Sequence, residues 1–228
     1  LLMKVAEIAQ RASAGSHSPL RFEFMVRPVR VRAEGNTELL GDMFLRCICA
    51  VELQVPGPLW FGVVLFLSTS VTSRIAIAPG GDALSEALVQ EVGRPGVTDV
   101  YPGVVTGNSI AFGQIDLTGM QPREVRTFRI TNVRCNATPI DRIFAAISVG
   151  GLQVDNNTAQ VAVAKPSLRF EVRESNNTQQ IKSEVPQDQP SRLTTLASLL
   201  FAEEFSEAFK IRNTTAPNLF RAESDGLV

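Results

Sequence analysis

Histidine is almost absent from this sequence: His17 is the only one in 228 residues. Nucleophilic triads and most zinc sites use histidine from inside a fold, whereas His17 lies in a serine-rich stretch. The sequence also lacks a Gly-x-Ser-x-Gly motif, a His-Glu-x-x-His motif and a phosphate-binding Walker loop. We therefore expect a protein that is not an enzyme and that binds no cofactor and no metal.

The sequence also has no excess of charge of either sign. It contains 22 Lys and Arg residues and 23 Asp and Glu residues, and its net charge is −1. Such a balance provides no broad basic surface for nucleic acid. The longest apolar run, Leu59–Leu67, is far shorter than the ~18 residues of a membrane span. We expect no nucleic-acid partner and no membrane span.

Carboxylates remain as candidate catalytic groups, because a glycosidase needs only two of them. Five lie near predicted turns or strand ends: Asp42, Asp82, Glu86, Asp99 and Asp116. The sequence brings no two of them to a catalytic distance, and solvated surface acids are the simpler interpretation. A carboxylate-only hydrolase is therefore the weakest of the functional hypotheses.

The three cysteines, Cys47, Cys49 and Cys135, permit at most one intramolecular disulfide. Cys47 and Cys49 alternate on a predicted strand and so share one face. The candidate disulfide is Cys47–Cys135, the alternative is Cys49–Cys135, and three buried thiols are the other interpretation. Four Asn-x-Ser/Thr sequons are candidate glycosylation sites: Asn136, Asn156, Asn176 and Asn213.

The sequence contains many runs in which apolar residues alternate with period two. Turn signals rich in Gly, Pro and Asn separate these runs, which favours an antiparallel β-sandwich or a barrel-like domain. Pro28 indicates an edge strand or a bulge. The run 59–71 is apolar on both faces and so predicts a central strand, with Trp60 in the core. The predicted strands are 21–26, 29–31, 42–51, 59–71, 109–117, 125–135, 142–149, 159–164 and 168–172.

Helical spacing is confined to the two ends of the chain. The mainly β fold is therefore predicted to carry short helices near both termini, within 1–20 and over 193–212, with a strand as the alternative for 193–201. For 84–92, one or two helical turns and a strand are equally compatible. The predicted organisation is an N-terminal arm (1–20), a β-sandwich domain (21–173), a polar loop or linker (174–192) and a C-terminal segment (193–228) that packs on the domain or on a neighbour.

Four segments resemble, in the same order, parts of an uncharacterised family of large secreted β-rich proteins of Acidobacteria. They are VRAEGNTELLGDMFL at 31–45, LFLSTSVTSRI at 65–75, RTFRITNVRCNA at 126–137 and FAEEFSEAFKIR at 201–212. The resemblance covers about 29–225 and implies the N-terminal region of a longer secreted protein. No cysteine precedes Val31 to pair with Cys47 as in those relatives, so the resemblance implies no disulfide here. It implies no catalytic residue either.

These observations predict a non-catalytic structural or adhesive module, a candidate subunit of a surface filament or layer. Its expected partners are further copies of itself or other surface proteins, and its expected location is extracellular or at the cell surface. The alternative is a glycan-binding or ligand-binding β module. A glycan-binding face would need exposed aromatic rings, and the sequence holds one tryptophan and one tyrosine.

Overall fold

The computed structural model describes residues 19–50, 58–77, 81, 83–94, 96–138, 140–174, 197–205 and 208. Within these ranges the chain forms strands and turns and no α-helix, which confirms the mainly β prediction but not the short helices. The predicted helix of the N-terminal arm lies outside the described residues, as does the polar loop beyond residue 174.

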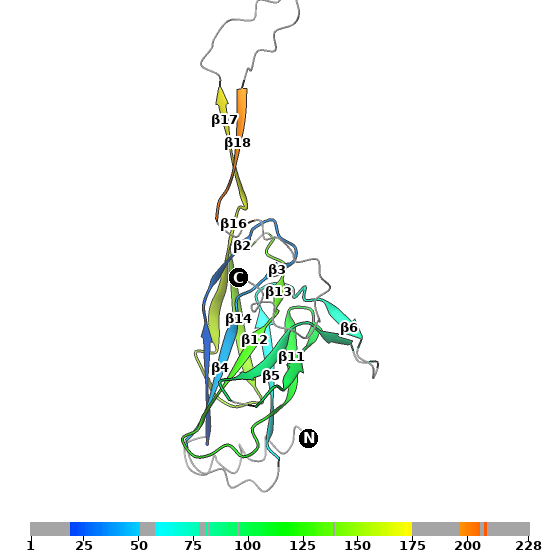
Figure 1. Cartoon of the computed structure of the whole chain (residues 1–228), viewed down its shortest axis with the longest axis vertical. Coiled ribbons are helices and arrows are strands. Elements are labelled where there is room, and N and C mark those ends of the chain that lie inside the picture. The colour runs from blue at the N-terminus through cyan, green and yellow to red at the C-terminus, as the bar shows by residue number, and fades with distance from the viewer. Residues whose placement is uncertain are drawn as a thin grey trace, which may run out of the picture. The chain divides into compact units, whose positions relative to one another are not determined.

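Two six-stranded sheets form the sandwich (Figure 1). Sheet 1 has the order β15 (Val154–Asp155), β1 (Leu20–Val26), β4 (Met43–Cys49), β12 (Val125–Thr131), β8 (Leu88–Val92), β9 (Val100–Pro102). Sheet 2 has the order β10 (Val104–Thr106), β11 (Ser109–Asp116), β5 (Trp60–Leu67), β14 (Arg142–Val149), β16 (Thr158–Lys165), β2 (Val29–Arg32). Neighbouring strands are antiparallel except in the pairs β1–β15 and β16–β2.

At two of its crossings the chain passes from one sheet to the other with almost no loop between the strands, which gives the sandwich its barrel-like character. One crossing is at Pro28, between β1 in sheet 1 and β2 in sheet 2, where the sequence predicts an interruption. The other is at Gly103, between β9 and β10. A Cβ atom on Gly103 would clash with Ile110 and lie 2.7 Å from Cε1 of Phe112, so this crossing requires glycine.

A short ladder closes one end of the sandwich. β13 (Arg134–Cys135) pairs with β3 (Glu38–Leu39) in the register of the β12–β4 ladder, so the two ladders form one continuous run. On its other side Cys135 forms an isolated bridge with Val71, which follows β5 of sheet 2. The segment around Cys135 therefore joins the two sheets.

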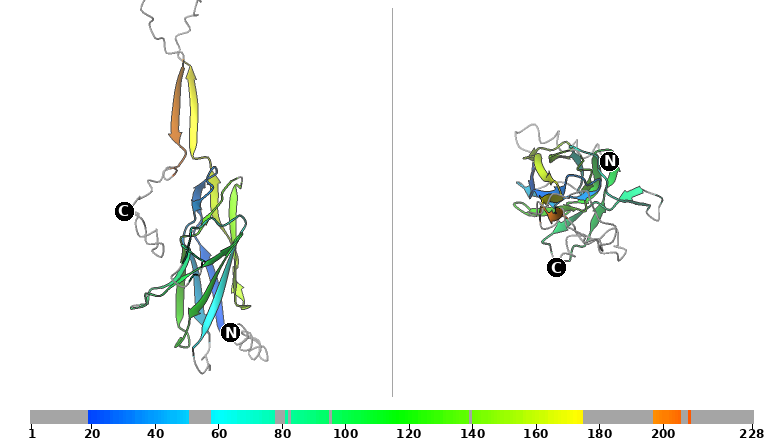
Figure 2. Two further views of the ribbon diagram at one scale, coloured as in Figure 1. Left: turned by 90° about the vertical axis from the view of Figure 1, so that its right-hand side faces the viewer. Right: turned by 90° about the horizontal axis from the view of Figure 1, so that it is seen from above.

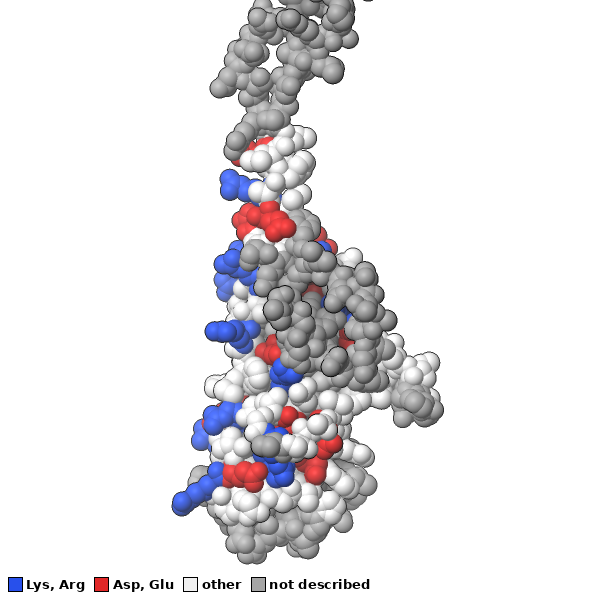
Figure 3. Space-filling view, viewed as in Figure 1, with Lys and Arg blue, Asp and Glu red and all other residues white. Residues whose placement is uncertain are grey.

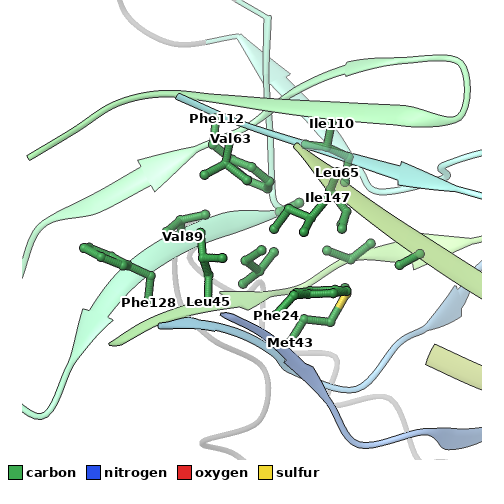
Figure 4. Close-up of a cluster of buried hydrophobic side chains, with 14 of the residues drawn as sticks. Phe24, Met43, Leu45, Val63, Leu65, Val89, Ile110, Phe112, Phe128 and Ile147 are labelled. Carbon is green, nitrogen blue, oxygen red and sulfur yellow. The ribbon is translucent and has the colours of Figure 1, made fainter. Parts of the chain in front are cut away.

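The core lies between the inward faces of the two sheets, where alternate residues of each strand are buried (Figure 4). Phe61 of sheet 2 packs between Phe22 and Phe128 of sheet 1, with both ring-centroid distances at 5.3 Å. Such tilted and edge-to-face contacts between aromatic rings are favourable. Each predicted strand between 21 and 172 has a counterpart in the structure, and 84–92 forms strands rather than helical turns.

A second unit begins at Pro166, directly after β16, where the chain divides into two compact units. It contains β17 (Leu168–Glu174) and β18 (Ala197–Glu203), which pair only with each other among the described strands (Figures 1 and 2). Of the predicted helix over 193–212, the described residues 197–203 form β18 instead, so the helix prediction is wrong there and the strand alternative holds for 197–201. The sandwich accordingly ends at Lys165 rather than at residue 173. A further hairpin, β6 (Ile75–Ile77) and β7 (Ala83–Ser85), was not predicted.

Candidate functional site

The β17–β18 hairpin collects its apolar residues on one face. Phe170 lies opposite Phe201 and Val172 lies opposite Leu199 in the antiparallel ladder. Residues directly opposite in such a ladder point to the same side, as do alternate residues of one strand. Leu168 therefore joins these four side chains, and we call the set of five the hairpin face.

All five side chains of the hairpin face are exposed, with Phe170 at 67% and Phe201 at 58%. At such exposures the hairpin face presents roughly 500 Å² of apolar surface, which is near the upper end of single patches on monomeric proteins and typical of interaction sites. An isolated two-stranded hairpin is at best marginally stable in water, because the hairpin has no core of its own. The hairpin face is therefore the strongest candidate for a functional surface.

The opposite side of the hairpin is different in character. It carries Arg169 and Glu171 on β17, and Leu200 and Ala202 face them from β18. All four are exposed. Leu200 thus lies between Leu199 and Phe201 in the sequence but on the other face, which makes it a natural control position.

A second exposed apolar area covers the outer side of sheet 2. Its exposed and half-buried apolar side chains come from β5, β10, β11 and β14, and we call this set the neutral sheet face: Trp60, Val64, Phe66, Val104, Ala111 and Phe144. On the described residues of β5, β10, β11 and β14, charge on this side is confined to Arg142 and Asp116 at the strand ends. Trp60, predicted in the core, is 39% exposed, because β5 is central within its sheet while only one of its faces meets the other sheet.

The outer side of sheet 1 is charged instead. Nε of Arg21 lies 2.5 Å from Oδ2 of Asp155, and Nη1 of Arg46 lies 2.9 Å from Oε2 of Glu23. Figure 3 shows side chains of both signs intermixed along the side where β4 lies in Figure 1. The two sheets thus present chemically different surfaces.

The candidate catalytic carboxylates are not assembled into a site. Asp42 lies 3.7 Å from Arg129, Asp99 is exposed before β9, and Asp116 accepts a hydrogen bond of 2.7 Å from the backbone amide of Thr118. Asp99 and Asp116 both lie near Tyr101, whose pKa is raised mainly by burial. Asp82 lies outside the described residues. Across the described part of the chain, no group of three His, Cys, Asp or Glu residues is placed to hold a metal ion.

Glu86, the fifth candidate, is buried in an ion-pair cluster with two arginines. Its carboxylate accepts hydrogen bonds of 2.6 Å from Nε of Arg74 and 3.0 Å from Nε of Arg134. The backbone amide of Arg74 donates a third, at 2.9 Å. A carboxylate held by so many donors stabilises the junction of β6, β7 and β13 and has no open side for a substrate.

A second buried ion-pair cluster surrounds Arg126. Its guanidinium donates to Oε1 of Glu124 at 2.8 Å and to the carbonyl of Thr118 at 3.1 Å. Burial alone would raise the pKa of Glu124, but hydrogen bonds from the Gln121 amide and from Arg126 outweigh it, so this pKa lies below its ordinary value. The sequence did not reveal the Glu86 cluster, because Glu86 and Arg134 are 48 positions apart in the chain.

All three cysteines are buried, and none of them forms a disulfide. Cys47 lies opposite Arg126 and Cys135 lies opposite Glu38 on one continuous ladder. The residues between Arg126 and Cys135 span roughly 30 Å at about 3.3 Å each, whereas a disulfide needs Cα atoms within about 7 Å. Neither Cys47–Cys135 nor Cys49–Cys135 is therefore formed. Burial raises the pKa of Cys47 and of Cys135 to about 12, which makes both thiols poor nucleophiles.

Two of the four candidate glycosylation sites lie in the described residues. The Asn136 side chain accepts a hydrogen bond of 2.9 Å from the Thr138 amide and so stabilises its own turn. Asn156 is exposed in the turn between β15 and β16, with a φ of 53°. Asn176 and Asn213 lie outside the described ranges.

No protein-family model, no curated protein and no solved structure matches the chain. The described residues also contain no helix of the length and apolarity that crossing a membrane requires. The surfaces of the molecule are therefore the basis for any functional conclusion.

Proposed function

We propose that the chain is a non-catalytic structural module that associates with further copies of itself through the β17–β18 hairpin. The observation that carries this proposal is the hairpin face, where five apolar side chains lie together and exposed on a two-stranded ribbon. Burying apolar surface stabilises a protein by about 25 cal/mol per Å², so covering this face favours assembly. The proposed setting is the cell surface or the extracellular space, as the family resemblance implies.

The edges of the sandwich support the hairpin as the point of assembly. Open strand edges are templates for pairing with another chain, and proteins blunt them by keeping edge strands short. The four outermost strands of the two sheets, β15, β9, β10 and β2, span two to four residues each. β17 and β18 span seven residues each and leave two longer edges beside the apolar face.

Electron microscopy and light scattering of the purified protein test the proposal. The unaltered chain should form ordered oligomers that grow with protein concentration, and Phe170→Ser with Phe201→Ser should abolish them. Leu200→Ser, on the opposite side of the same strand, should assemble like the unaltered protein. A strictly monomeric unaltered protein at about 100 µM would overturn the proposal, because that is far above the Kd of a specific interface.

A glycan-binding module is the second candidate, and the exposure of Trp60 favours it. The neutral sheet face combines that ring with Phe66 and Phe144 on a flat sheet, and apolar sugar faces stack on such rings. A glycan array with the unaltered protein and with Trp60→Ala tests this function. Binding that disappears in the variant would support it, and an array without signal would exclude it.

A further inference from the structure

We infer that the hairpin face of one copy packs on the neutral sheet face of a second copy. This inference rests on the proposed function and names the surface that receives the hairpin. Two exposed apolar surfaces lie on the same chain, and a single kind of contact between copies covers both. A contact between two hairpin faces would leave the neutral sheet face in water.

The two surfaces match in spacing. Phe201 and Glu203 are alternate residues of β18 on the side of the hairpin face, and Phe144 and Arg142 are alternate residues of β14 on the side of the neutral sheet face. Alternate residues of a strand lie about 7 Å apart. If β18 of one copy lies antiparallel over β14 of another, with Phe201 on Phe144, then Glu203 lies beside Arg142.

The charges distinguish this contact from a symmetric one. Glu203 and Arg142 are both exposed and of opposite sign. Between two hairpin faces, Glu203 would find no cation among the other described residues on that side. Complementary charge at the rim of an apolar contact fixes the register and orientation of partners.

The area is sufficient for a specific contact of modest affinity. The hairpin face and the neutral sheet face contribute roughly 500 Å² and 400 Å² of apolar surface, and their backbone and rim add to this, so the contact reaches the ~1,000 Å² that specific interfaces need. Two sheets pack face to face at about 10 Å with strands nearly aligned, a geometry that flat surfaces allow.

Each copy carries one hairpin face and one neutral sheet face, so it can take part in two such contacts. Copies joined in this way form an open chain or a closed ring, and a reciprocal two-fold dimer is the smallest such ring.

Mixing two blocked variants tests the inference by sedimentation velocity. Phe170→Ser with Phe201→Ser blocks the hairpin face, and Phe66→Ser with Phe144→Ser blocks the neutral sheet face. Each variant alone should be monomeric, with association weakened by about 30-fold or more, as for an aromatic hot spot. Their equimolar mixture should form a one-to-one dimer and nothing larger, because one productive contact remains.

Met25→Ser, on the outer side of sheet 1, is the matched control for the sheet variant and should assemble normally. If the sheet variant assembles like the unaltered protein while the hairpin variant stays monomeric, the inference fails and the proposed function stands. If both variants assemble normally, both fail. The exchanges Glu203→Arg and Arg142→Glu should each weaken association and together restore it, and the absence of that rescue would also overturn the inference.

Discussion

Arg134 donates a hydrogen bond of 3.0 Å to the buried carboxylate of Glu86 across 48 positions of sequence. The donor lies on β13 and the acceptor directly follows β7, so the contact ties the β6–β7 hairpin to the ladder that joins the two sheets. Buried ion pairs are costly to break, because the remaining partner keeps its charge without compensation.

Glu86→Gln should lower the free energy of unfolding by about 3 kcal/mol, since it leaves the largely buried guanidinium of Arg134 without its counter-charge. Urea unfolding followed by the fluorescence of Trp60 measures this loss. Glu23→Gln is the control, because the pair of Glu23 with Arg46 is partly exposed and should be worth less than about 1 kcal/mol. Equal losses in the two variants would contradict a structural role for the Glu86 cluster.

Gly103→Ala should destabilise the sandwich by about 2 kcal/mol, because the added methyl group would overlap Ile110 and Phe112 at the crossing between β9 and β10. Gly113→Ala is the matched control on β11, where a Cβ atom meets nothing within 4 Å. Thermal unfolding of the two variants compares them directly. The crossing would not need glycine if both variants melted alike.

The three cysteines should react with a thiol reagent only after unfolding. Burial and the raised pKa of Cys47 and Cys135 keep the thiolate fraction small at pH 8. Titration with Ellman's reagent should show almost no reaction in the native protein and three thiols in guanidinium chloride. Recovery of a single thiol from the denatured, unreduced protein would instead reveal a disulfide.

Glu124 should make folding stability depend on pH in the acid range. Its pKa in the folded protein lies below the ordinary value of 4.5, because the Gln121 amide and Arg126 stabilise the carboxylate. The stabilisation is therefore complete above pH 4.5 and is lost as the pH falls through the folded pKa. Glu124→Gln should be less stable than the unaltered protein at pH 7, and the difference should shrink below pH 4.5. A difference that stayed constant with pH would contradict this origin.

The strands of the sandwich could be predicted because their pattern is local. Met43, Leu45 and Cys47 alternate with half-buried neighbours, and the structure places these three residues in the core. The interruption at Pro28 follows from the missing amide hydrogen of proline. The sequence does not show which face of an apolar strand is covered by the other sheet. For this reason the prediction that Trp60 lies in the core is wrong.

β18 shows the same limit for local patterns. Ala197, Leu199 and Leu200 are good helix formers, and the run from Leu193 also fits helical spacing. Pairing with β17, which is distant in the sequence, overrides that preference. The hairpin face could therefore not be predicted from the sequence, since Phe170 and Phe201 become neighbours only through this pairing.

Photo-crosslinking from position 170 tests the central claim most directly. A benzoylphenylalanine in place of Phe170, in a mixture of isotopically light and heavy copies, distinguishes links within one chain from links between chains. We predict mixed light–heavy links from position 170 to β5 and β14, near Phe66 and Phe144. Links confined to a single chain, or links between the hairpins of two copies, would contradict the account.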